Sequence, residues 1–117
     1  MNKRYQVIYD TEHFTGDCCY FDTLKESLDS AIEIFKGWME DEKNTWKYKN
    51  GIPNLTTEEI ERWNYMIDTC EAYVVDTEYG GDEPEIKKNE SYYWIDGHYY
   101  PSLEITEALG WKYIERN

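Results

Sequence analysis

Residues 92–100 read YYWIDGHYY, and this stretch decides the type of sheet that the chain forms. Asp96-Gly97 suits the two positive-φ positions of a two-residue type I′ turn, and aromatic residues stand on both sides of it. The pattern predicts a β-hairpin whose second strand ends at Pro101. A turn of this length joins antiparallel strands, so we expect an antiparallel sheet.

The N-terminal segment has the pattern of a strand and its partner. Over residues 4–9, Tyr5, Val7 and Tyr9 alternate with side chains of the other face, which is the period of a half-buried strand. A turn-rich stretch follows, and the short apolar run at residues 18–21 is expected to pair back on the first strand. The two segments together predict a second hairpin.

A helix is predicted over residues 24–41. Thr23 and Glu26 have the spacing of a capping box, in which the two side chains satisfy free amides of the first helical turn. The apolar residues that follow recur at three- and four-residue steps and form one stripe: Leu24, Leu28, Ala31, Ile32, Phe35 and Met39. Residues 42–54 lose this pattern and are expected to form a loop held by Trp46.

A second helix is predicted to run from a cap at Thr56 to about Cys70. Thr56 and Glu59 form another capping box. Leu55 and Ile60 flank this box at the spacing of a hydrophobic staple, which lets the two side chains touch around the cap. The two coincident signals make this helix start specific.

The C-terminal half is predicted to hold mostly strands. Residues 72–75 are β-branched and aromatic, and Gly80-Gly81 is expected to turn the chain back at residues 85–88. Residues 103–109 are expected to form a short helix that ends at Gly110. Residues 111–114 alternate and are predicted to be a last strand.

These elements indicate an α+β fold in a single domain over residues 1–117. The length suits one domain. Hairpin-length links and two helices adjacent in sequence predict an antiparallel sheet with two main helices and one short helix packed on one face.

Composition and charge exclude several classes of function. The chain carries 25 acidic and 12 basic side chains, a net charge of −13, which disfavours direct binding of DNA and of anionic membranes. The 12 Tyr, 5 Trp and 3 Phe argue against a disordered acidic chain. Three cysteines, an odd and sparse number, and the lack of an apolar leader favour the cytoplasm.

The residues that could carry chemistry do not form a known motif. His13, Cys18, Cys19, Cys70 and His98 are the candidate metal ligands or nucleophiles. Adjacent cysteines are expected to project to opposite sides of a strand, unlike the ligand pairs of zinc sites. No phosphate-binding glycine motif occurs. We therefore predict buried or structural thiols, no cofactor, and no enzymatic activity.

The most unusual feature is an acidic stretch over residues 71–85, which holds six acids and no base. The predicted partner-binding residues are Glu71, Asp76, Glu78, Tyr79, Asp82, Glu83 and Glu85, with Glu58 and Glu61 on the second helix as further candidates. Carboxylates on a folded scaffold can imitate nucleic-acid phosphates and pair with Lys and Arg of a basic groove. A solvated acidic loop that only keeps the protein soluble is the alternative interpretation.

In size, acidity, tyrosine content and order of elements the chain resembles the small acidic anti-CRISPR inhibitors made by phages and mobile elements. The resemblance implies a non-enzymatic inhibitor in the bacterial host cytoplasm. Its partner would be an RNA-guided nuclease, and it would occupy the cleft that reads the short duplex motif of the target. Some such inhibitors block nuclease domains or bind guide RNA instead.

Three other functions stay open at this level. An immunity protein that neutralises a basic toxin nuclease would use the same electrostatics. A small metal-binding or enzymatic domain would use Cys18, Cys19 and a histidine. An accessory domain would have no charge-dependent partner.

Overall fold

Five strands form one antiparallel sheet in a computed structural model that describes residues 3–78, 92–95 and 97–115. The strands are β1 (Tyr5–Asp10), β2 (Thr15–Phe21), β5 (Glu71–Asp76), β6 (Tyr92–Ile95) and β7 (His98–Pro101). Their order across the sheet is β2-β1-β5-β7-β6, so β5 returns to the centre after both long helices. The predicted hairpin at residues 92–100 is confirmed, and so are the N-terminal hairpin and the strand at 72–75.

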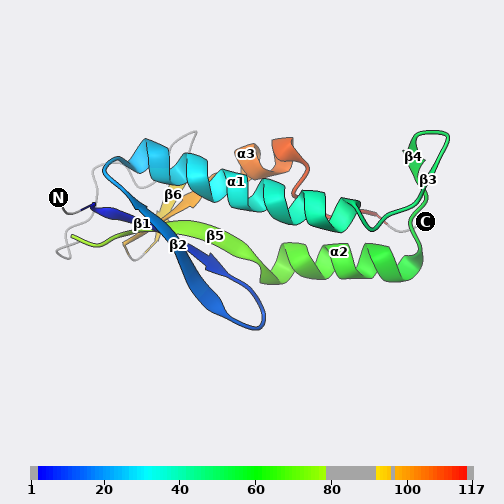
Figure 1. The fold of residues 1–117 in the computed structure, drawn as a ribbon, viewed down its shortest axis with the longest axis horizontal. Helices are drawn as coiled ribbons and strands as arrows, with labels where there is room; N and C mark the ends of the chain where they lie inside the picture. Colours follow the sequence, from blue (N-terminus) through cyan, green and yellow to red (C-terminus); the bar gives the residue numbers. More distant parts are fainter. Residues whose placement is uncertain (1–2, 79–91, 96, 116–117) are drawn as a thin grey trace.

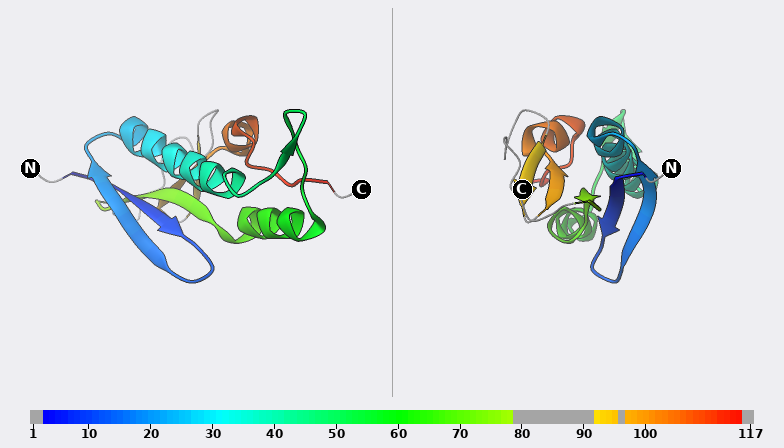
Figure 2. Two further views of the ribbon diagram at one scale, coloured as in Figure 1. Left: turned by 45° about the vertical axis from the view of Figure 1, so that its right-hand side comes forward. Right: turned by 90° about the vertical axis from the view of Figure 1, so that its left-hand side faces the viewer.

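Three helices accompany the sheet: α1 (Leu24–Lys43), α2 (Thr57–Thr69) and α3 (Leu103–Leu109). Helices α1 and α3 lie on the same side of the strands (Figure 2). Helix α2 leads into β5, lies in line with that strand beyond its first residue, and is beneath the C-terminal half of α1 (Figure 1). The α+β class is thus confirmed, whereas α2 extends the sheet lengthwise instead of covering its face, giving a molecule of 51 × 25 × 24 Å.

Both long helices begin at the predicted caps. Thr56 accepts from the Glu59 amide at 3.1 Å, and the Glu59 carboxylate accepts from the Thr56 amide at 3.1 Å, a complete capping box. Thr23 accepts from the Glu26 amide at 3.2 Å, but here the Glu26 carboxylate accepts from the Thr23 hydroxyl instead of its amide.

The core lies between α1 and the sheet and continues between α1 and α2. Its buried residues are Val7, Leu28, Ala31, Phe35, Met39, Trp46, Trp63, Ala72, Val74, Tyr99 and Trp111. Trp46 packs on Trp63 with ring centroids 5.3 Å apart, so it holds the loop between the helices as predicted. That loop also contains a short hairpin of β3 (Tyr48–Lys49) and β4 (Ile52–Pro53).

The prediction of a last strand at residues 111–114 is wrong. The carbonyl of Lys112 accepts from the Trp63 indole at 2.8 Å. The Asn64 side chain donates to the Ile114 carbonyl at 3.0 Å and accepts from the Ile114 amide at 2.8 Å. Side chains of α2 therefore provide the hydrogen bonds that a neighbouring strand would provide, while Trp111 fills the core.

The hairpin expected about Gly80-Gly81, with its return at residues 85–88, lies outside the described residues. The short helix at 103–109 is confirmed, and Gly110 ends it with a φ of 106°.

Candidate protein-interaction surface

The structure separates the predicted partner-binding residues. Glu71 begins β5 and Glu78 follows it, and both are exposed. Glu58 and Glu61 are exposed on the first two turns of α2, at the end of the molecule away from the sheet (Figure 1). Tyr79, Asp82, Glu83 and Glu85 lie outside the described residues.

Asp76 differs from the other predicted acids because its side chain is buried. Arg4 donates to it through Nε and Nη2, each at 2.7 Å, in a bidentate ion pair between β5 and the residue before β1. This hydrogen bonding holds the pKa of Asp76 below its ordinary value, although burial acts in the opposite direction. The carboxylate is paired within the fold, so Asp76 joins strands of the sheet and is less accessible to a partner than the exposed acids Glu71 and Glu78.

The sheet face away from α1, which we call the open face, is the candidate interaction surface. Alternation along each strand assigns its residues: Gln6, Ile8, Asp10, Thr15, Asp17, Tyr20, Glu71, Tyr73, Val75, Tyr93, Ile95, His98 and Tyr100. None of these side chains is buried, in contrast to Val7, Ala72 and Val74 on the other face. None of the three described helices covers this face.

Four rings form a continuous aromatic row across β5, β7 and β6. Tyr73 stacks on His98 with centroids 5.0 Å apart, and the Tyr73 and Tyr100 rings are also 5.0 Å apart. Tyr100 in turn stacks on Tyr93 at 5.1 Å. Rigid tyrosines of this kind offer contact area to a partner at little entropic cost.

Carboxylates border the aromatic row on the side of β1. Asp10 lies directly opposite Glu71 in the pairing of β1 with β5. Neighbouring groups partly desolvate the exposed Glu71 carboxylate, and this desolvation, followed by the charge of Asp10, raises the pKa of Glu71 above its ordinary value. Burial, followed by the charge of Glu71, raises the pKa of Tyr100 to about 12, so this hydroxyl stays protonated at neutral pH. No Lys or Arg stands among the strand positions assigned above to the open face.

A pocket opens at the end of this face, where β5 and β7 stop pairing. The pairing covers Val74 and Val75 only, and beyond it Ala72 and Pro101 both line the pocket. Its volume is about 240 Å³, smaller than the roughly 300–1,000 Å³ of sites for drug-sized ligands. That size suits one side chain better than a whole cofactor.

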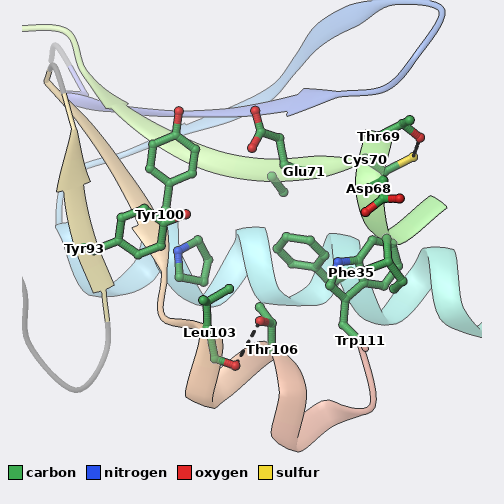
Figure 3. Close-up of a pocket in the computed structure, with 13 residues that line it drawn as sticks. Phe35, Asp68, Thr69, Cys70, Glu71, Tyr93, Tyr100, Leu103, Thr106 and Trp111 are labelled. Atoms are coloured by element: carbon green, nitrogen blue, oxygen red, sulfur yellow. Dashed lines mark hydrogen bonds between the residues drawn. The ribbon is translucent and has the colours of Figure 1, made fainter. Parts of the chain in front are cut away.

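The pocket combines an aromatic interior with an acidic rim (Figure 3). Phe35 and Trp111 line its interior, and Tyr93 and Tyr100 form one side. Asp68 and Glu71 are its two acidic lining residues, and no Lys or Arg is among the described residues that line it. Aromatic faces and carboxylates together attract a cationic group.

Most residues of the open face were not predicted as a site from the sequence. The acidic stretch drew attention to Glu71, but its neighbours Asp10 and Tyr100 are 61 residues before and 29 residues after it in the chain. The alternation Glu71, Tyr73, Val75 is visible along the strand, yet it becomes a surface only when the order β1-β5-β7 is known.

The candidate metal ligands do not gather at one place. His13 is exposed in the turn after β1, while His98 stacks on Tyr73 in the aromatic row. Within the described ranges, no group of three or more His, Cys, Asp or Glu side chains is arranged to hold a metal ion. The expectation that Cys18 and Cys19 project to opposite sides is wrong, because their sulfur atoms are 2.8 Å apart.

In the part of the chain that the structure describes, no helix has the length and apolar character needed to cross a membrane. Comparison of the chain with protein families, with curated proteins and with solved structures finds no match.

Proposed function

We propose that this protein is a non-enzymatic inhibitor that binds a basic, nucleic-acid-binding cleft of an RNA-guided nuclease through its open face. The observation that carries the proposal is the composition of this face, which combines an aromatic row with Asp10, Asp17 and Glu71 and has no Lys or Arg at its described strand positions. The resemblance to small acidic anti-CRISPR inhibitors supports the choice of partner.

Charge complementarity explains why a nucleic-acid-binding cleft suits this face. Such a cleft presents Lys and Arg, which normally neutralise phosphates. Asp10 and Glu71 hold two carboxylates at adjacent positions of neighbouring strands, where they repel each other in the free protein. A basic partner relieves that repulsion, and the net charge of −13 accelerates the encounter.

The pocket supplies an anchor point for one basic side chain. The aliphatic part of an arginine can lie against Phe35 and Trp111, and its guanidinium group can reach the carboxylate of Glu71. The few residues that dominate the binding energy of an interface often include an Arg that inserts into a buried aromatic pocket.

The test is inhibition of DNA cleavage by a panel of purified, guide-loaded RNA-guided nucleases, with one toxin-type nuclease included. The open-face variant Asp10→Asn/Glu71→Gln removes two charges from the proposed surface. The control variant Asp29→Asn/Glu33→Gln removes two charges from the exposed side of α1, where each acid has only a surface ion pair.

We expect the wild type and the control to inhibit one of the RNA-guided nucleases, and the open-face variant to need about tenfold more protein. Equal inhibition by the two variants would place the interface elsewhere. Inhibition of the toxin nuclease alone would contradict the proposed partner and support an immunity protein.

A further inference from the structure

The sulfur atoms of Cys18 and Cys19 are 2.8 Å apart, although the two residues are adjacent in one strand. Cys18 is exposed and Cys19 is half-buried, and both are free thiols. The Cys19 sulfur also lies 3.4 Å from the Ser30 hydroxyl of α1. This arrangement is separate from the aromatic row and from the pocket.

A β-bulge brings the two thiols together. Val7 of β1 pairs with Cys19, but the next residue of β1, Ile8, pairs with Asp17. Cys18 is therefore an extra residue that has no paired residue in β1. Regular alternation would send adjacent side chains to opposite faces, and an extra residue interrupts that alternation.

We propose that Cys18 and Cys19 form a reversible disulfide within β2 by exchange with a low-molecular-weight disulfide such as oxidised glutathione. The exposed Cys18 thiolate attacks one sulfur of glutathione disulfide, which breaks its S–S bond and releases one glutathione thiolate. The Cys19 thiolate then attacks the Cys18 sulfur of the mixed disulfide and releases the second. The two thiol protons pass to the two glutathione molecules, so two cysteines are oxidised while one disulfide is reduced.

Chain geometry makes this bond easy to reduce again. Adjacent Cα atoms are about 3.8 Å apart across a trans peptide, whereas the Cα atoms of most disulfides are about 4.4–6.8 Å apart. A disulfide formed under such strain has a more oxidising potential than a structural one and is of the labile kind. The pair therefore responds to the redox state and does not hold the fold together.

Protonation sets the rate of the exchange. The hydrogen bond between the two thiols raises the pKa of Cys18 above its ordinary value, and partial burial acts in the same direction. The thiolate that starts the exchange is scarce at neutral pH, so disulfide formation should accelerate as the pH rises toward that pKa.

The experiment incubates the reduced protein with excess glutathione disulfide and measures intact mass and a tryptic map. We expect a product lighter by two hydrogen atoms, with the loss confined to the peptide that spans residues 5–25, and full reversal by dithiothreitol. Cys70→Ser is the matched control and should give the same product. Cys18→Ser and Cys19→Ser should instead retain one glutathionyl group on the remaining thiol of the pair.

Circular dichroism of each variant shows whether the fold is retained. If a variant unfolds, the tryptic map of the wild-type protein alone tests the proposal. Wild-type protein that carries only glutathionyl groups at residues 18 and 19, without loss of two hydrogens, would overturn the proposal. A disulfide that joins Cys18 to Cys70 or to a second molecule would do the same.

Discussion

The ion pair between Arg4 and Asp76 joins two central strands. Its acid is buried and its base is about half exposed. Because the pKa of Asp76 is lowered in the folded state, its ionisation stabilises the fold at pH values above the unfolded pKa near 3.8. That stabilisation is lost as the pH falls through the lower folded pKa.

We predict that Asp76→Asn lowers the free energy of unfolding at neutral pH by about 1–2 kcal/mol, since it removes one charge-assisted hydrogen bond and weakens the other. Urea unfolding at pH 7 and below pH 4 measures this, and the deficit should shrink at the lower pH. Asp41→Asn, at an exposed position of α1, should change stability little. A pH-independent deficit would contradict the role given to the charge.

The pKa shift of Glu71 has the opposite sign to that of Asp76. Its pKa is raised in the folded state, so its ionisation opposes folding. The protonated carboxyl contributes its full stability below the unfolded pKa near 4.5, and this contribution is lost as the pH rises through the folded pKa. Glu71→Gln should therefore raise the melting temperature at pH 7, and the difference from wild type should vanish at low pH.

The ionised Glu71 is unfavourable in the free protein, and we expect it to be favourable against a basic partner, as in a binding surface. The same substitution should therefore weaken partner binding. Thermal unfolding and partner binding are measured on Glu71→Gln beside the control Glu40→Gln, whose acid is exposed on α1. Lower stability of Glu71→Gln at pH 7 would show that Glu71 supports the fold.

At the scale of elements, the C-terminal segment after α3 depends on α2. Asn64 makes both of its described hydrogen bonds with the backbone of Ile114. We predict that Asn64→Ala costs about 1–3 kcal/mol of stability because two half-buried backbone groups of Ile114 lose their partner.

Hydrogen exchange should report the loss locally, as faster exchange of the Ile114 amide in Asn64→Ala. Asn54→Ala, at an exposed loop position, is the control. Unchanged protection at Ile114 would mean that packing of Trp111 alone holds the segment.

The elements predicted well from the sequence are those with local signals. The Asp96-Gly97 turn and the Thr56 cap act over three or four residues, and both the hairpin and the helix start were found. Residues 111–114 alternate like a strand, yet Trp63 and Asn64, far away in the chain, take up their backbone groups.

The candidate site was harder to predict because its parts meet through the strand order. Asp76 looked like one more surface acid, since its partner Arg4 stands 72 residues away in the sequence. The aromatic row needs β5 beside β7, a pairing that follows from the whole fold and not from either segment.

At the scale of the whole molecule, α1 and α3 pack on one face of the sheet, and no helix among the described residues covers the open face. The open face thus gathers the three tyrosines of the aromatic row with the strand carboxylates of Asp10, Asp17 and Glu71.

The most direct measurement of the central claim is displacement of a fluorescent target duplex from a guide-loaded nuclease of the inhibited class. The account predicts that wild-type protein and Asp29→Asn/Glu33→Gln release the duplex, that Asp10→Asn/Glu71→Gln does so about tenfold less well, and that higher salt weakens the competition. A nuclease that retains its duplex while bound to the protein, or equal displacement by both variants, would contradict it.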